Sequence, residues 1–384
     1  MLKCKGTELA KFYHKIILMA NLKTWVNIDS AAIKHNFKTI KSLLKPQTEL
    51  WAVVKSNAYG HGLLAFSKIA NQIGVDGFCV DSVIEARKLR DEYIKKPVLV
   101  LGSTLPDLYT EALRNNIIIT ISNFDGLRSW IKSKYKPPFH LKIDSGMHRQ
   151  GFYPEEIPKV IAEFKKIKDV KNYLTGVYTH FASAKDINYP TYTDIQFEKF
   201  MKSVQILEKS GFKNIKKHCA ATGGAMINDK YHLDAVRIGI GLYGLWPSKE
   251  LEIQLSDKVV LKPSLSWHAL ISEIKNVPAG SYIGYDMAER VLKPTKMAII
   301  PIGYWHGFPR LLSSTGEVIV KNKKARVLGR VSMDLICVDV TGIPCKVGDA
   351  ATIIGSSYDI AQKTGTSHYE VVTRINPLIE RVVT

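Results

Sequence analysis

The stretch that decides the fold is Leu50-Trp51-Ala52-Val53-Val54-Lys55-Ser56-Asn57-Ala58-Tyr59-Gly60-His61-Gly62. Its first five residues are apolar, which predicts a buried strand, and this strand ends on Lys55. Ammonium groups are strongly hydrated, so a lysine at the mouth of a buried strand, before a glycine-containing loop, is a place for amine chemistry. Desolvation lowers a lysine pKa, and the neutral amine is the form that attacks carbonyl groups. The alternative is a lysine whose ammonium group simply reaches solvent.

Similar apolar runs recur from Trp51 to about Gly244 and alternate with amphipathic helical stretches such as 83–93 and 194–210. The runs cover residues 51–54, 77–80, 97–101, 117–121, 139–143, 173–178, 215–219 and 235–238. About eight strand–helix units predict an α/β fold with a (β/α)8, TIM-like barrel. Runs that are apolar at every residue are what a parallel sheet covered on both faces requires.

The pattern changes after about Leu255, where β-branched segments are separated by turn residues and long helices are missing. This pattern predicts a mostly antiparallel β domain. We therefore expect an N-terminal extension over 1–18, a barrel over 19–255 and a β domain over 256–384. The early strand at about 24–29 is a candidate to join the C-terminal domain.

The composition limits the class of protein. The 384 residues are 46% hydrophobic, enough for a sizeable core, and no apolar run approaches membrane-spanning length. The formal net charge is +19, but the lysines are spread along helices and form no dense basic run. They read as solvated faces, so we expect no nucleic-acid partner, and a basic field would also attract small anions. Five scattered cysteines without a C-x-x-C pair fit a reducing, cytoplasmic compartment and predict no metal site.

Polar residues follow several of the predicted strands. Lys55 follows the first, Asp144–Arg149 the fifth and His180 the sixth, Thr222 lies beyond the seventh, and Arg237 lies in the eighth. In a (β/α)8 barrel the C-terminal ends of the strands form one rim, where the chemistry occurs. A lysine, arginines and glycine-assisted backbone donors on one rim suit pyridoxal 5'-phosphate, whose aldehyde binds lysine and whose phosphate takes backbone N–H groups.

Five ordered motifs make the sequence resemble the alanine racemases, fold-type III racemases that depend on pyridoxal phosphate. They span residues 52–62, 141–151, 237–244, 302–304 and 329–334, and the similarity runs from about Trp25 to the C-terminus. The resemblance implies a barrel followed by a β domain, in a homodimer whose active sites are each built from both subunits. It also implies interconversion of L- and D-alanine, and hence D-alanine for peptidoglycan.

The same resemblance implies roles for individual residues. Lys55 binds the cofactor and is one of two catalytic bases, and the other is Tyr285 from the partner subunit. The other implied cofactor contacts are Tyr59, His180, Thr222, Arg237, Gly239 and Ile240. The implied substrate contacts are Arg149, Met333, Tyr304 and Asp334. Racemisation needs two bases, because one group must remove a proton from one face while another returns a proton to the opposite face.

The chain departs from the family pattern at three places. Trp305-His306 follows the entrance tyrosine in place of Ala-Asp, Ala221 stands where an asparagine is expected, and Ile375–Leu378 lacks a phosphate-binding tyrosine. Trp305 keeps open a racemase of broader or different specificity, for serine or lysine. A related barrel-type decarboxylase is disfavoured, because such enzymes pair the cofactor's ring nitrogen with a carboxylate and this chain offers Arg237. Whether Lys142 is carbamylated, as in some members, is left open by the sequence.

Overall fold

The computed structural model describes residues 22–384, so the extension predicted over 1–18 lies outside the described residues. The chain divides into two compact units. The barrel unit comprises Ser30–Ala58 and Leu63–Ser264. The β unit comprises the stretch ending at Asp29, the short segment Tyr59–Gly62, and Leu265–Thr384.

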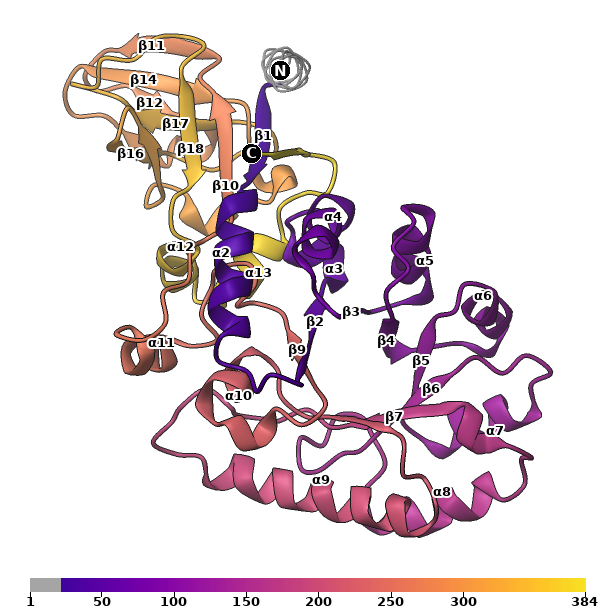
Figure 1. Ribbon diagram of the computed structural model, residues 1–384. Helices are drawn as coiled ribbons and strands as arrows, with labels where there is room; N and C mark the ends of the chain where they lie inside the picture. Colours follow the sequence, from indigo (N-terminus) through magenta and orange to yellow (C-terminus); the bar gives the residue numbers. More distant parts are fainter. Residues whose placement is uncertain (1–21) are drawn as a thin grey trace, which may run out of the picture. The chain divides into compact units, whose positions relative to one another are not determined.

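The barrel unit contains an eight-stranded parallel sheet in the order β8-β7-β6-β5-β4-β3-β2-β9 (Figure 1). The strands are β2 Glu49–Val53, β3 Gly77–Val80, β4 Val98–Ser103, β5 Ile118–Ile121, β6 Phe139–Lys142, β7 Leu174–Tyr178, β8 Lys216–His218 and β9 Ala235–Ile238. The two edge strands meet as well, because Asp234 N–H donates to Lys217 O (3.1 Å) and Arg237 N–H to Ala220 O (3.0 Å). The sheet therefore closes into a barrel, and the predicted fold class is confirmed.

Helices connect the successive strands and cover the outside of the barrel (Figure 1). They are α2 Ser30–Lys41, α4 Leu63–Ile73, α5 Val83–Asp91, α6 Tyr109–Arg114, α7 Phe124–Lys132, α8 Ile157–Phe164, α9 Thr191–Lys209, α10 Thr222–Ile227 and α11 Lys249–Leu255. Short 3-10 turns lie at Pro106–Leu108, Pro154–Glu156, Val170–Asn172 and Asp229–Tyr231. Several of these helices begin at a side-chain cap: Ser82, Asn123 and Ser248 accept hydrogen bonds from the first turns of α5, α7 and α11.

The barrel interior is filled by large side chains that sit opposite glycines. Trp51, His140 and His218 are each at most 2% exposed, and the ring centroids of the two histidines lie 5.0 Å apart. A Cβ atom on Gly77 would lie 2.7 Å from the Trp51 ring, and one on Gly176 would lie 2.5 Å from His140 Nε2. Large side chains on one strand thus fill the space left by glycines on the neighbouring strand, which lets the interior of the closed barrel be filled.

The β unit is built on a nine-stranded sheet in the order β11-β14-β17-β16-β15-β18-β10-β1-β19. The strands are β1 Thr24–Ile28, β10 Leu265–Leu270, β11 Glu273–Val277, β14 Thr295–Ile300, β15 Glu317–Val320, β16 Lys323–Leu328, β17 Ile336–Asp339, β18 Ala350–Ile354 and β19 Glu380–Val383. The unit also contains a two-stranded ribbon, β12 Tyr282–Ile283 with β13 Glu289–Arg290, and two helices, α12 Ser357–Thr364 and α13 His368–Thr373. Short 3-10 turns lie at Tyr285–Met287, Tyr304–His306 and Arg310–Leu312.

The sheet of the β unit is antiparallel except for one pair, β1 with β19. The early strand β1 pairs with β10 in the register Thr24 to Ala269 through Ile28 to Leu265. Trp267 and Ala269 of β10 are fully buried and alternate with more exposed neighbours, the pattern of a sheet with one face in the core.

Candidate active site

Lys55 lies two residues beyond the C-terminal end of β2 and begins a short turn of unusual backbone geometry, Lys55–Tyr59, which Figure 1 labels α3. Val54 N–H donates to Cys79 O (2.8 Å), which ties this end of β2 to β3. The next four residues, Ser56 to Tyr59, all have positive φ between 51° and 56°. Left-handed geometry is unfavourable for residues with a Cβ atom, so the surrounding structure must hold this turn.

The structure brings Lys55 together with the other rim residues predicted from the sequence. We call Lys55, Lys142, Arg149, His180 and Arg237 the rim cluster. Burial, and then the charges of Arg237, Arg149, Lys142 and Lys55, lower the pKa of His180 to about 3. Burial, and then mainly Arg149 and Arg237, lower the pKa of Lys142 to about 8. This concentration of positive charge on one rim favours an anionic ligand.

Arg237 is the most buried cation of the rim cluster, with 3% of its surface exposed. Its Nη2 donates to Thr179 O (2.8 Å) and Cys219 O (3.2 Å), and its Nη1 donates to His218 Nδ1 (2.7 Å). Within residues 22–384, Arg237 Nε–H has no hydrogen-bond acceptor. Since a guanidinium has only donors and keeps its proton, this group is available to an acceptor atom of a ligand.

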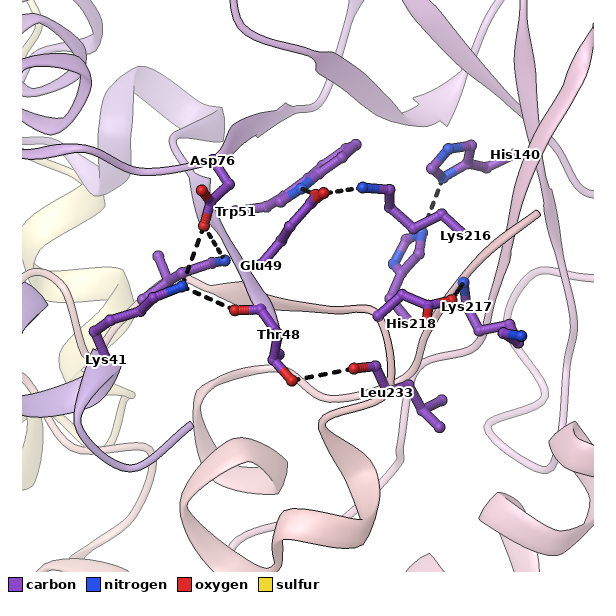
Figure 2. Close-up of polar contacts among 12 residues, drawn as sticks. Lys41, Thr48, Glu49, Trp51, Asp76, His140, Lys216, Lys217, His218 and Leu233 are labelled. Atoms are coloured by element: carbon purple, nitrogen blue, oxygen red, sulfur yellow. Dashed lines mark hydrogen bonds and ion pairs between the residues drawn. The ribbon is translucent and has the colours of Figure 1, made fainter. Parts of the chain in front are cut away.

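Behind Arg237, a hydrogen-bond chain runs through the barrel interior. Since the guanidinium can only donate, His218 Nδ1 must accept, and its Nε2–H then donates to His140 Nδ1 at 2.8 Å (Figure 2). Burial and nearby cations lower the pKa of His140 to about 3 and that of His218 well below its ordinary value. Both histidines are therefore neutral, and their tautomers are fixed.

The far end of the barrel interior is closed by Glu49, Lys216 and Trp51 (Figure 2). Glu49 accepts a hydrogen bond from Trp51 Nε1 (2.7 Å) and pairs with Lys216, whose ammonium lies 5.4 Å above the Trp51 ring. The polar groups of these three side chains bind one another, so we assign a structural and not a catalytic role to this end of the barrel. The conserved pattern of TIM-like barrels, with chemistry at the opposite rim, agrees with that assignment.

Arg149 is carried by a loop that the carboxylate of Asp144 organises. Asp144 accepts four backbone N–H bonds of 2.9–3.0 Å from Gly146, Met147, His148 and Arg149. Burial opposes ionisation of Asp144, but the four bonds together lower its pKa. Because all four bonds come from the loop backbone, this carboxylate fixes the loop that presents Arg149.

A small pocket lies over this loop and is lined by Lys142, Asp144, Arg149, Gln150 and His180, among others. Lys142 Nζ donates to Gln150 Oε1 (2.9 Å) at its wall. With a pKa of about 8, Lys142 is more readily neutral than an ordinary lysine. Gln150 was not singled out in the sequence, because a glutamine in a loop carries no signal of such a contact.

The residues predicted to hold a phosphate lie beyond β9. Gly239 and Ile240 are buried, yet no hydrogen bond among the described residues uses their backbone N–H groups. Gly241 N–H reaches Thr222 Oγ1 (3.3 Å), so the turn after β9 packs against the start of α10. Buried N–H groups without acceptors are costly, and an anionic ligand would satisfy these two.

At Ala221 the departure from the family pattern leaves a helix without a side-chain cap. It occupies the N-cap position of α10 and provides no side-chain hydrogen bond there. An asparagine at this position would supply an acceptor for the first turn of the helix.

The β unit carries Tyr285 at the tip of the β12–β13 ribbon. Tyr285 is 66% exposed and follows Gly284, whose φ is 74°. Asp286 forms an ion pair with Arg330 Nε (2.8 Å), which anchors the turn beside the segment 329–334. A side chain so exposed has few contacts in its own chain, which suits a group that acts elsewhere.

Tyr304, Met333 and Asp334 lie in two segments that pair with each other. Tyr304 N–H donates to Ser332 O (3.0 Å) and Trp305 N–H to Met333 O (3.1 Å). Tyr304, Met333 and Asp334 are all exposed, and we call them, with Tyr285, the tyrosine face. No hydrogen bond among the described residues uses Met333 N–H, so it can serve a ligand.

Two of the three departures from the family pattern, Trp305-His306 and Ile375–Leu378, contact each other in the β unit. Asn376 Nδ2 donates to Trp305 O (3.1 Å), and Asn376 N–H donates to His306 O (3.1 Å). His306 Nδ1 accepts from Gly303 N–H (3.2 Å), the capping contact that an aspartate could also make. Asn376 therefore holds the segment after Tyr304, and this link was not foreseen from the sequence.

Tyr59 belongs to the segment Tyr59–Gly62, which packs within the β unit. Its ring centroid lies 6.1 Å from that of Tyr369 in α13. Arg381 of β19 donates to Gly60 O from both Nε (3.1 Å) and Nη2 (2.9 Å). Residues of the C-terminal segment thus contact Tyr59 and Gly60 within the β unit.

Known proteins match nearly the whole chain. The sequence models of the alanine racemase N-terminal and C-terminal domains match residues 28–247 and 264–383. The chain belongs to the alanine racemase family. The alanine racemase of Leptospira interrogans serovar Lai is 37% identical over 94% of this chain and 95% of its own length. That of Desulforamulus reducens is 38% identical over 93% and 98%.

Solved alanine racemase structures share this fold. The alanine racemase of Clostridium difficile 630 matches with a TM-score of 0.88 at 31% identity, over 95% of this chain and 96% of its own. The structure from Bacillus anthracis, with bound L-Ala-P, gives 0.86 at 32% identity over 94% and 95%. The resemblance read from the motifs is confirmed, and so is the prediction of an isomerase of this family. The roles of individual residues stay predictions.

No helix in residues 22–384 has both the length and the apolar character needed to cross a membrane. The same part of the chain holds no group of three or more His, Cys, Asp or Glu residues arranged for a metal ion.

Proposed function

We propose that the chain interconverts L-alanine and D-alanine with pyridoxal 5'-phosphate as its cofactor. The observation that carries this proposal is the rim cluster with its free donors, in a chain of the alanine racemase family. The cations of the rim match a phosphate and a carboxylate, and the N–H groups of Gly239 and Ile240 are buried donors for which no acceptor is found among residues 22–384.

The residues present fit the cofactor at each of its polar groups. Lys55 would bind it covalently, and Arg237 would donate to its ring nitrogen beside His180. Its phosphate would take the N–H groups of Gly239 and Ile240, with hydroxyls from Thr222 and Tyr59. When bound, the cofactor makes the α-hydrogen of the amino acid acidic by drawing electron density from the α-carbon.

The proton transfers belong to two residues of this sequence. Lys55 Nζ takes or returns the α-proton on one face, and Tyr285 Oη acts on the other. Tyr285 is exposed on the tyrosine face, which supports a homodimer in which each subunit lends Tyr285 to its partner's site. His180, which is neutral at physiological pH, would orient Tyr285 and tune its acidity.

The substrate carboxylate would be held by one group from each subunit. Arg149 offers a planar pair of donors, which suits a carboxylate, and the partner's Met333 would add its free backbone N–H. Tyr304 and Asp334 would border the entrance and limit the size of the substrate side chain. D-alanine made in this way would serve peptidoglycan synthesis in the cytoplasm, a compartment that fits the free cysteines Cys79, Cys219, Cys337 and Cys345.

The test compares the wild type with Lys55→Ala and Tyr285→Phe. We expect a visible absorption band from the lysine-bound cofactor in the wild type and in Tyr285→Phe, and no such band in Lys55→Ala. Both variants should lose conversion of L-alanine to D-alanine by about 10²-fold or more, the range of positioned acid–base groups. An unchanged rate in either variant contradicts the two-base assignment, and faster turnover of serine or lysine would favour the broader specificity.

A further inference from the structure

The left-handed turn after Lys55 is held by a carboxylate from the next strand–helix unit. Ser56, Asn57 and Ala58 have φ of 51–56° and ψ of 44–52°. This left-handed conformation is unfavourable for residues that carry a Cβ atom. None of the three is a glycine, so the conformation must be imposed by contacts.

Glu85 of α5 accepts hydrogen bonds from the first residues of this turn. Two further bonds support the turn, from Ala58 N–H to Val54 O (2.9 Å) and from Leu63 N–H to Asn57 Oδ1 (2.8 Å). Glu85 Oε1 accepts from Ser56 N–H (2.8 Å) and more weakly from Asn57 N–H (3.4 Å). Its Oε2 accepts from Asp81 N–H (2.8 Å), just beyond the end of β3. One carboxylate therefore joins the ends of β2 and β3 at the rim.

The side chain of Glu85 does not do what its sequence position suggests. The stretch Ser82-Val83-Ile84-Glu85 has the spacing of a capping box, and Ser82 Oγ does accept from Glu85 N–H (3.2 Å). In a capping box the glutamate would bond back to the N–H of the capping serine. Here both of its oxygens bind other N–H groups, two of them in the turn that follows Lys55.

Lys55 needs such an anchor because its surroundings repel it. Its positive charge contributes to lowering the pKa of both Lys142 and His180, so it acts within a cluster of cations. Repulsion would drive a free ammonium group away from the rim. A backbone that starts the side chain in one fixed direction counteracts this tendency.

We propose that Glu85 is a positioning residue for Lys55, because its carboxylate holds the left-handed turn that aims the lysine at the rim. This inference rests on the proposed role of Lys55 as the cofactor-binding residue. Only a carboxylate can accept on both sides. A glutamine would turn an NH2 donor toward the N–H of either Ser56 or Asp81, and an alanine would lose every contact.

The experiment titrates cofactor-free protein with pyridoxal 5'-phosphate and follows the visible band of the lysine-bound cofactor. The proteins are the wild type, Glu85→Gln, Glu85→Ala and the matched control Glu111→Gln. Glu111 is also a helix glutamate, and among residues 22–384 its carboxylate pairs with Arg87 (3.2 Å). We expect affinity to fall about tenfold in Glu85→Gln and about a hundredfold in Glu85→Ala, with no change in the control.

A rescue variant separates positioning from general destabilisation. Glycine adopts left-handed geometry freely, so adding Ser56→Gly to Glu85→Ala should restore affinity about fivefold. With L-alanine as substrate, kcat should fall more than KM rises, because the turn carries a base and not the carboxylate site.

Three results would overturn the proposal: wild-type affinity in both Glu85 variants, a lowered melting temperature with an unchanged titration, or no rescue by Ser56→Gly. Lys55→Ala is titrated in parallel. A visible band that persists in Lys55→Ala would show instead that the assigned role of Lys55 is wrong.

Discussion

The rim cluster and the tyrosine face carry the two halves of the expected chemistry in opposite physical states. Arg237 is 3% exposed, and its Nη1 and Nη2 atoms donate to His218 and Thr179. By contrast, Tyr285 is 66% exposed and Met333 is 52% exposed. In the first region, hydrogen bonds within one chain already fix the Arg237 guanidinium and the backbone of Arg149. The second consists of groups whose backbone is anchored and whose functional atoms are free. A site shared between subunits would need this division.

The strongest test of this comparison mixes two inactive proteins. In a heterodimer of Lys55→Ala and Tyr285→Phe subunits, one of the two sites combines an intact Lys55 with an intact Tyr285. Random pairing makes half of the dimers hybrid, so we expect about a quarter of wild-type activity to return. Activity is measured after co-expression, with each variant alone as the control. A mixture that stays inactive would mean that both bases come from one chain.

A second test concerns the buried histidines behind the rim. His140 and His218 are held neutral by burial, with pKa values below the 6.5 of an exposed histidine. Below pH 6.5 these two histidines bind protons in the unfolded chain but stay neutral in the native barrel. The free energy of unfolding must therefore fall as the pH falls. These two groups should remove about 2–3 kcal/mol of unfolding free energy between pH 7 and pH 5.5.

The measurement is urea unfolding at both pH values, on the wild type and on His140→Phe. His140→Phe should lose less stability on acidification, whatever its stability at pH 7. His148→Gln, at an exposed position in the Arg149 loop, is the control. An equal pH dependence in His140→Phe and the wild type would show that His140 titrates as a solvated group.

The third test weakens the rim without touching a charged side chain that binds substrate. In Asp144→Asn the amide can no longer accept all four backbone N–H groups, so the Arg149 loop should loosen. We expect a loss of about 1–3 kcal/mol at pH 7 and a rise in KM for alanine that exceeds the fall in kcat. The pKa of Asp144 is lowered in the native state, so its contribution is present above pH 3.8 and disappears as the pH falls through the native value.

The difference in stability between Asp144→Asn and the wild type should therefore shrink in acid. Urea unfolding at pH 7 and pH 3 measures it. A constant difference would mean that the carboxylate charge has no part in holding the loop.

The smallest expected effect comes from Ala221→Asn, which supplies the missing cap of α10. We expect about 1 kcal/mol of added stability, read from urea unfolding, with Ala221→Leu as a control that adds bulk without an acceptor. A gain in both variants would assign the effect to packing.

Much of the fold could be predicted from the sequence, because a strand buried on both faces appears as a continuous apolar run. The eight apolar runs coincide with strands β2 to β9, and the rim residues follow from the direction that parallel strands share. Lys55 and Arg237 could be placed in this way, since both stand at strand ends where a charged residue is conspicuous.

The supporting contacts could not be read, because they depend on distance in space. Ser56 and Ala58 are residue types that rarely adopt left-handed geometry, so the sequence does not predict the turn. Glu85 has the sequence position of an ordinary capping glutamate. The pairing of His218 with His140 joins residues 78 positions apart. The sequence therefore predicts which groups react, whereas the contacts that hold them are visible only in the fold.

The glycines of the barrel interior have a consequence for sequence variation. Gly176 has no unusual φ, so its backbone does not demand glycine; the space that its Cβ atom would take belongs to the His140 ring. A larger residue at position 77 would likewise collide with the Trp51 ring. We expect positions 140 and 176, and likewise 51 and 77, to covary among relatives, so that a larger residue at one position accompanies a smaller one at the other.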